Sequence, residues 1–346
     1  MESKYVIKKN ELIKRVCNYK KHASVYYPVK ANSNIEVLRL LDSYVSGYEV
    51  ESINHLDLLL KELNVKPERI IFSSFINNES EIRSILLRGI NKFVVDNLET
   101  INSIISISNI SSVSFIIRLD LSQFINCGET INKWGAFIED AVKMIEAIKF
   151  SSCEFCGVSF YLPQELNTIE HFKKIIYEIG NISDFKKIKI IDIGGGIDLP
   201  LLPEIVDCVH KSMIDYETEI IIEPGRHLLN PCIDLICTVK SIRKTNKQSL
   251  LIIDCGIYNG LLDKIIKNRL FDIELIEGAG KSSIESYSEF LVCGPTSDSS
   301  DVIGLYSFPS KISVGSNLLI KSCGAYCSEL NTVFYQINRV GYATDS

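Results

Sequence analysis

Short β-branched runs alternate with segments of helical periodicity over the first two thirds of the chain. The segments between the runs carry apolar residues three or four positions apart, as at Leu56, Leu59 and Leu63, which predicts amphipathic helices. The predicted strands are Ser24–Ala31, Ser46–Val50, Arg69–Ser74, Lys92–Asp96, Ser112–Asp120, Phe155–Tyr161, Lys189–Gly194 and Glu219–Glu223. Eight strand–helix units in roughly 200 residues predict an α/β fold, a (β/α)8 TIM-type barrel over residues 23–230. A doubly wound open sheet is the alternative.

After about residue 231 the pattern becomes a succession of strands with few helical stretches. The predicted strands are Ile233–Ile242, Ser249–Ile257, Phe271–Glu277, Glu289–Cys293, Lys311–Ile320 and Val333–Ile337, and turn-rich links such as Gly304 to Pro309 join them. This pattern predicts an all-β C-terminal domain over residues 231–346, an antiparallel sandwich or barrel. Residues 1–22 are predicted to form an N-terminal segment that packs on this β domain.

The bulk properties narrow the class of protein. The chain has 346 residues, of which 46% are hydrophobic and 23% charged, as in ordinary globular proteins. Its net charge of −6 and lack of a basic block argue against a nucleic-acid surface. No apolar stretch approaches the ~20 residues of a membrane span, and the N-terminus lacks the core of a signal peptide. We therefore expect a cytoplasmic protein that binds neither nucleic acid nor membrane.

The 11 cysteines indicate neither a metal site nor a disulfide framework. Cys153 and Cys156 form a lone Cys-x-x-Cys that runs into an apolar stretch, and the five histidines are scattered. An odd number of cysteines in a chain without a secretion signal also argues against disulfides. We expect reduced thiols in the core and no metal.

Residues at the C-terminal ends of barrel strands point into the active site of such a fold. Lys30 ends the first predicted strand between Val29 and Ala31, so its amine could lie in an apolar mouth. Desolvation there would lower its pKa and supply the neutral amine that attacks an aldehyde. Taken alone, Lys30 would fit a surface lysine at a strand end better than a catalytic one.

Two further strand ends carry motifs. Gly194, Gly195 and Gly196 offer backbone N–H groups that can approach a phosphate, although a tight turn between strand and helix would look the same. No G-x-G-x-x-G pattern is present, so a dinucleotide is not indicated. Glu223 ends a very apolar strand and needs a positive partner, which a protonated pyridine nitrogen or Arg226 could provide.

The sequences around Lys30, Gly194–Gly196 and Glu223 resemble motifs of the fold-type III pyridoxal-phosphate decarboxylases, the ornithine and diaminopimelate decarboxylase family. Gly294-Pro295-Thr296 and Gly324-Ala325-Tyr326 resemble two further motifs of that family, and all five motifs stand in the family order. The resemblance extends from about Tyr27 to Phe334. It implies an alanine-racemase-like barrel with a β domain, pyridoxal 5'-phosphate as the cofactor, and a homodimer with shared active sites.

The resemblance also implies a role for each matching residue. Lys30 would carry the cofactor as an internal aldimine, Glu223 would hold the pyridine nitrogen, and Tyr161 would stack on the pyridine ring. The phosphate would be bound by Gly194, Gly195, Gly196, Gly225, Arg226 and Tyr326. Asp298 of the partner subunit would meet the distal polar group of the substrate, and Phe334 would lie near the substrate.

The chain departs from the family pattern at four positions. Ser297 stands where a cysteine usually reprotonates the carbon left by CO₂, and a hydroxyl is a far weaker acid than a thiol. His55 replaces a usual glutamate, Tyr161 a usual histidine, and Gln164 a usual small residue. These changes suggest a divergent substrate, a specialised pathway or eroded activity. The arginine-rich segment expected of a diaminopimelate decarboxylase after Tyr326 is absent, which disfavours that substrate.

We therefore expect a homodimeric pyridoxal-phosphate-dependent decarboxylase of an amino acid or derivative, diamino-acid-like and either free or carrier-bound. Ser297, His55 or a water would return the proton to the substrate carbon. Two alternatives stay open. One is a racemase or decarboxylating deaminase on the same scaffold, and the other is a non-catalytic homologue.

Overall fold

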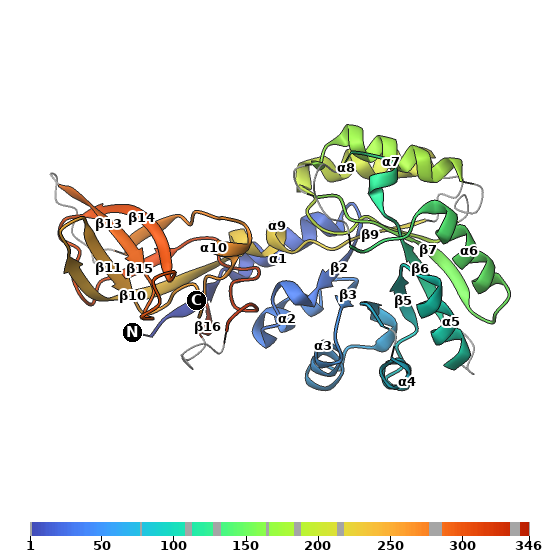
Figure 1. Ribbon diagram of the computed structural model, residues 1–346, viewed down its shortest axis with the longest axis horizontal. Coiled ribbons are helices and arrows are strands. Elements are labelled where there is room, and N and C mark those ends of the chain that lie inside the picture. Colours follow the sequence, from blue (N-terminus) through green and yellow to red (C-terminus); the bar gives the residue numbers. More distant parts are fainter. Residues whose placement is uncertain are drawn as a thin grey trace. The chain divides into compact units, whose positions relative to one another are not determined.

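The computed structural model describes residues 2–76, 78–107, 113–126, 133–163, 166–182, 188–212, 218–276, 286–332 and 340–345. These residues form two compact units (Figure 1). The barrel unit comprises residues 15–30 and 38–227, and the β unit comprises residues 1–14, 31–37 and 228–346. Within the described residues, no helix has the length and apolar character needed to cross a membrane.

Eight parallel strands close into a barrel in the order β2 to β9. Their bounds are β2 Ser24–Pro28, β3 Gly47–Val50, β4 Ile70–Ser73, β5 Lys92–Val95, β6 Ser114–Arg118, β7 Glu154–Ser159, β8 Ile190–Asp192 and β9 Glu219–Ile222. The ring closes where β2 pairs with β9, with Val25 opposite Ile222. The predicted barrel is thus confirmed, and the open-sheet alternative is wrong.

Helices lie outside the ring of strands (Figure 1). Their bounds are α1 Lys9–Lys20, α2 Ile35–Asp42, α3 Ile53–Asp57, α4 Glu79–Leu87, α5 Leu98–Ile107, α6 Ile138–Lys149, α7 Ile169–Asn181, α8 Leu202–Ser212 and α9 Arg226–Leu229. The helix α7 shows why these segments are helical, since it buries Phe172, Ile175 and Ile179 on one face. Thr168 caps its first turn by accepting the N–H of His171.

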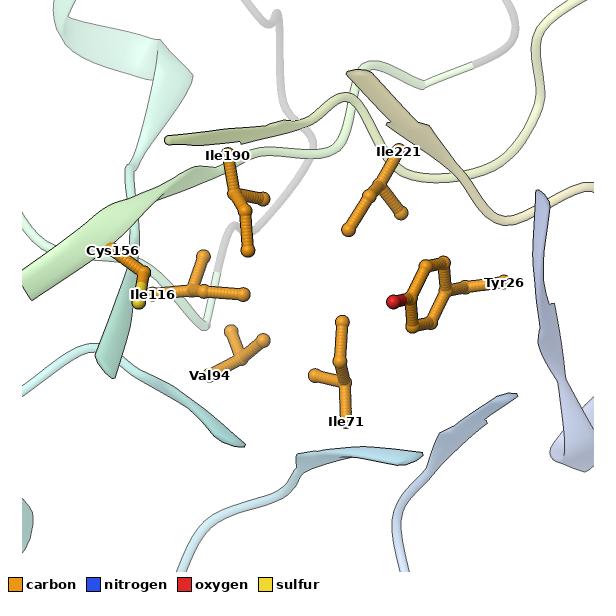
Figure 2. Close-up of a cluster of buried hydrophobic side chains, with 7 residues drawn as sticks. All are labelled: Tyr26, Ile71, Val94, Ile116, Cys156, Ile190 and Ile221. Atoms are coloured by element: carbon orange, nitrogen blue, oxygen red, sulfur yellow. The ribbon is translucent and has the colours of Figure 1, made fainter. Parts of the chain in front are cut away.

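The interior of the barrel is filled by side chains that point toward one another from the surrounding strands (Figure 2). They are Tyr26, Ile71, Val94, Ile116, Cys156, Ile190 and Ile221, one from each strand except β3. Close packing also fixes a glycine at position 157. A Cβ there would lie 1.9 Å from the carbonyl oxygen of Ile190, because β7 and β8 pair at these residues. The barrel is therefore a packed core rather than a pore.

The β unit contains one mixed sheet of eight strands among the described residues. The strands are β1 Lys4–Ile7, β10 Ile233–Lys244, β11 Ser249–Ile253, β12 Ile273–Ile276, β13 Tyr287–Cys293, β14 Val302–Pro309, β15 Asn317–Ile320 and β16 Gly341–Thr344, with the short helix α10 at Asp263–Ile266. The main path runs β12-β15-β10-β11-β13-β14, while β1 pairs with β10 and β16.

Three details of the β unit differ from expectation. Gly304 to Pro309, predicted as a link, lies within β14, which pairs along β13 up to Tyr287 opposite Pro309. The sheet is not purely antiparallel, because β11 pairs with β13 and β1 with β16 in parallel. The predicted strand Val333–Ile337 lies outside the described residues.

Candidate active site

Lys30 lies in a 3-10 turn, Val29–Ala31, directly after β2. Its Nζ donates to Glu51 Oε1 at 2.6 Å and lies 3.3 Å from each carboxylate oxygen of Glu49. Glu49 is on β3 and Glu51 directly follows that strand. The side chain of Lys30 is one-third exposed, at 33%, so it is reachable from solvent at this end of the barrel.

The carboxyl groups around Lys30 change its protonation. Burial lowers the pKa of Lys30, but Glu49, Glu223 and Glu51 outweigh burial and raise that pKa above its ordinary value. The expected fall in the Lys30 pKa is therefore wrong. Burial raises the pKa of Glu49 to about 8, and the ammonium of Lys30 only partly opposes this rise.

Glu223 directly follows β9 and connects two of the motifs. Its N–H donates to the carbonyl of Gly194 at 2.9 Å. Burial and the neighbouring Asp192 raise the pKa of Glu223 to about 8, whereas Lys30 and Arg118 lower it. The surroundings of Glu223 thus favour its protonated form, and a further positive group beside it would favour the ionised form.

The glycine loop follows β8. Gly194 and Gly196 have φ of +66° and +83°, a conformation that L side chains rarely adopt. A Cβ on Gly195 would lie 2.7 Å from the carbonyl oxygen of Glu223. A Cβ on Gly194 or Gly196 would lie 3.6 and 3.8 Å from the ring of Tyr161, which is 44% exposed. The loop therefore presents bare backbone beneath an exposed aromatic ring.

Two polar side chains hold this loop in place. The buried carboxylate of Asp192 accepts the N–H of Gly194 at 2.9 Å and the hydroxyl of Ser159 at 3.0 Å. Burial raises the pKa of Asp192, and these hydrogen bonds oppose the rise. The side-chain amide of Asn167 donates to the carbonyl of Gly196. The glycine loop is thus pre-formed by contacts within the barrel unit.

The remaining predicted residues of the barrel unit lie on the helices α3 and α9 or directly before them. Gly225 is buried, and Arg226, the first residue of α9, is partly exposed. His55 is on α3, where its N–H donates to the hydroxyl of Ser52 at 3.2 Å. Gln164 lies outside the described residues.

The other predicted site residues belong to the β unit. The carboxylate of Asp298 accepts the N–H of Ser300 at 2.8 Å and the hydroxyl of Tyr258 at 3.1 Å, which lowers its pKa. Ser297 is in the same loop as Asp298. Tyr326 has φ of +61°, and its N–H donates to the carbonyl of Ala31 at 2.8 Å. Phe334 lies outside the described residues.

Sequence reasoning gave no role to several charged residues at this end of the barrel. Arg118 and Asp192 are the last residues of β6 and β8, and Glu49 is a charged residue inside the apolar strand β3. The guanidinium of Arg118 stacks over Trp134, with its central carbon 4.5 Å from the ring centre. A search for charged residues within two positions of every predicted strand end would have found them.

One group in the β unit has ligand atoms close enough to hold a metal ion. The thiols of Cys237 and Cys255 and a carboxylate oxygen of Asp254 lie within 4.8 Å of one another. Contact with Cys255 and burial raise the pKa of the Cys237 thiol, which opposes the thiolate that a metal requires. Asp254 already accepts the N–H of Thr238 at 2.8 Å. We interpret this group as part of the core.

The barrel site combines groups that suit one kind of ligand. An amine beside carboxylates can bond to an aldehyde, and a buried acid can pair with a protonated ring nitrogen. A loop that only glycines can form leaves room for a phosphate against the backbone. The residues present therefore fit pyridoxal phosphate, which carries all three groups.

Comparisons with known proteins agree with this chemistry. Residues 5–230 match the family model described as pyridoxal-dependent decarboxylase, pyridoxal binding domain. The chain is 24% identical over 331 residues to the decarboxylase flvG of Aspergillus flavus, a match that covers 89% of this chain and 77% of that protein. It is 24% identical over 347 residues to the diaminopimelate decarboxylase of Aquifex aeolicus, covering 93% and 81%.

Solved structures share the fold. The arginine decarboxylase of Paramecium bursaria Chlorella virus superposes with a TM-score of 0.87 at 20% identity, covering 100% of this chain and 96% of that one. The Helicobacter pylori diaminopimelate decarboxylase in complex with L-lysine gives a TM-score of 0.86 at 23% identity, covering 100% and 92%. The family match spans well over half of this chain, so the chain belongs to the pyridoxal-dependent decarboxylases, amino acid carboxy-lyases that use pyridoxal phosphate.

Proposed function

We propose that this decarboxylase holds its cofactor through Lys30 and acts on an amino acid or derivative with a second polar group, free or carrier-bound. One observation supports the proposal above the others. The amine of Lys30 lies 3.3 Å from the buried carboxylate of Glu49, and it also acts electrostatically on Glu223 across the barrel mouth. Bound pyridoxal phosphate supplies the electron sink for the charge left on the α-carbon when CO₂ departs.

Lys30 would bond covalently to the aldehyde carbon of the cofactor. Glu223 would accept a hydrogen bond from the protonated pyridine nitrogen. This positive neighbour would return Glu223 to its ionised form, because an opposite charge lowers the pKa of a carboxyl. The proposed pairing is supported by the burial of Glu223 and its closeness to Asp192, which raise its pKa and make a positive partner favourable.

The glycine loop would bind the phosphate. The N–H of Gly194 is committed to Asp192, so this contact falls to Gly195 and Gly196, with Gly225, Arg226 and Tyr326 as further contacts. The exposed ring of Tyr161 would stack on the pyridine ring in place of the family histidine, as two aromatic rings commonly do.

The substrate would be bound by residues of both subunits of a homodimer, with Asp298 of the partner subunit meeting its distal group and Phe334 lying beside it. Ser297, His55 or a water would return the proton. The relatives are described as acting on diaminopimelate, lysine and ornithine, which supports a diamino-acid-like substrate. Sedimentation of the purified protein checks the dimer, and a monomer in the presence of cofactor would contradict the shared site.

Absorbance of the purified protein with pyridoxal phosphate tests the role of Lys30. We expect a visible band at about 420 nm. Borohydride should remove this band and leave the cofactor permanently attached to Lys30, where it serves as a label. The Lys30→Ala variant should lack the band, and Lys61→Ala, an exposed lysine on the helical segment after α3, should retain it. No band in the parent protein, or a label on another lysine, would overturn the assignment.

Product analysis then tests the reaction. Ornithine, lysine, arginine and diaminopimelate should be offered with detection of CO₂ and chromatography of the products. One amine for each CO₂ supports decarboxylation of the substrate concerned. An enantiomer without CO₂, or an aldehyde, would replace the proposal with the racemase or decarboxylating deaminase alternative.

A further inference from the structure

Glu51 is an acid in the barrel mouth that none of the roles above uses. Its Oε1 lies 2.6 Å from Lys30 Nζ, closer than either oxygen of Glu49 at 3.3 Å. The two acids also differ in exposure, since the Glu51 side chain is 38% exposed and that of Glu49 is 1% exposed. Lys30 therefore has one buried and one solvated carboxyl beside it.

The two carboxyls differ in what an ion pair with Lys30 requires. A charge on Glu49 lies in a fully buried position, and burial of a charge is costly. Glu51 keeps contact with water while it accepts the 2.6 Å hydrogen bond from the Lys30 ammonium. Glu51 is therefore the nearer of the two carboxyls and the one that the ammonium can reach without leaving solvent.

We propose that Glu51 receives the ammonium of Lys30 whenever Lys30 is not bonded to the cofactor, and so acts as a positioning residue for that lysine. The inference rests on the proposed covalent role of Lys30. If a substrate ammonium took the place of Lys30, the double bond to the aldehyde carbon would pass from the Lys30 nitrogen to the substrate nitrogen. Two protons would pass from the substrate nitrogen to Lys30, and Lys30 would depart as an ammonium that Glu51 neutralises.

Several charged groups surround the Lys30 nitrogen, and Glu51 can be replaced without changing the others. Glu49 faces it from β3 and Glu223 acts on it from the segment after β9, while Arg118 and Asp192 act on Glu223. Replacement of Glu51 leaves all four of these groups in place. The replacement therefore tests the effect of the Glu51 carboxylate alone.

The rate at which the cofactor-free protein bonds to pyridoxal phosphate, measured against pH, tests the inference without any turnover. Only the neutral amine of Lys30 attacks the aldehyde, and an adjacent carboxylate holds the amine protonated. We expect the Glu51→Gln midpoint to lie about one pH unit below that of the parent. The rate below both midpoints then rises about tenfold.

Two variants serve as references. Glu51→Asp retains the charge and should return the midpoint toward that of the parent protein. Glu62→Gln, at an exposed position on the segment after α3, should leave the midpoint unchanged. An unshifted midpoint in Glu51→Gln, with Lys30 labelled in both proteins, would overturn the inference. Failure of the parent protein to label Lys30 at any pH would instead overturn the proposed function.

Discussion

Replacement of Gly195 by alanine should weaken cofactor binding without unfolding the barrel. The added Cβ would lie 2.7 Å from the carbonyl oxygen of Glu223, whereas carbon and oxygen atoms in such contacts ordinarily stay about 3.3 Å apart. The two segments must therefore separate by about 0.6 Å. They cannot separate freely, because the N–H of Glu223 donates to the carbonyl of Gly194 at 2.9 Å.

The size of the effect follows from this geometry. Overpacking of a well-packed site costs about 1–3 kcal/mol, and the shift acts on both the glycine loop and the acid proposed for the pyridine nitrogen. We expect the Kd for pyridoxal phosphate to rise about 10- to 100-fold. Titration of the cofactor-free protein, followed by visible absorbance, measures this change. Urea unfolding shows whether the barrel is intact.

Gly341→Ala is the matched control, because a Cβ at position 341 would have nothing within 4 Å. Its Kd should equal that of the parent protein. If Gly195→Ala also bound the cofactor with the parental Kd while remaining folded, the glycine loop would not approach the cofactor. The phosphate site would then have to be sought elsewhere.

Three further changes test the fold and the site. Gly157→Ala should destabilise the barrel by about 3 kcal/mol or more in urea unfolding, because its Cβ would lie 1.9 Å from the carbonyl oxygen of Ile190. An unfolding midpoint equal to that of the parent protein would contradict the close pairing of β7 with β8. Glu49→Gln should flatten the pH dependence of stability. The folded protein keeps Glu49 protonated up to its pKa of about 8, while the unfolded chain ionises near 4.5. The parent therefore loses up to about 1.4 kcal/mol of stability per pH unit as pH rises between these values. Parallel curves for the two proteins would show that Glu49 is not desolvated. Tyr161→Ala should raise the Kd for pyridoxal phosphate about 2- to 10-fold and Tyr161→Phe should not, since stacking needs only the ring; equal losses in both would indicate a role for the hydroxyl.

The barrel could be predicted because each of its strands is a short buried run between amphipathic helices. The strand ends were less accurate, and the expected strand Lys189–Gly194 stops at Asp192. The loop that follows needs a positive φ at Gly194 and Gly196. Residues paired in a β-sheet have a negative φ, so the strand must end before this loop. Apolar periodicity reports burial, and it carries no signal for the point at which backbone pairing ends.

The family motifs pointed to Lys30 and Glu223 but not to Glu51, which only the fold brings beside Lys30. Lys30 and Glu223 follow apolar strands and stand out in the sequence. Glu51 lies 21 positions from Lys30, and nothing in the spacing shows that parallel pairing of β2 with β3 brings the two side chains to 2.6 Å. The protonation of Lys30 depends on this contact, so it could not be derived from the flanking residues alone.

The β unit is assembled from three separate stretches of chain, and this order matters during synthesis on the ribosome. The strand β1 at Lys4–Ile7 leaves the ribosome well before its antiparallel partner β10, which begins at Ile233. At about 5–20 residues per second, β1 waits about 10 to 50 seconds while the whole barrel sequence is made. During that interval its backbone edge is unpaired and open to the wrong partner. Nascent chains of this protein should therefore need a chaperone most while the barrel is folding and the β unit is still incomplete.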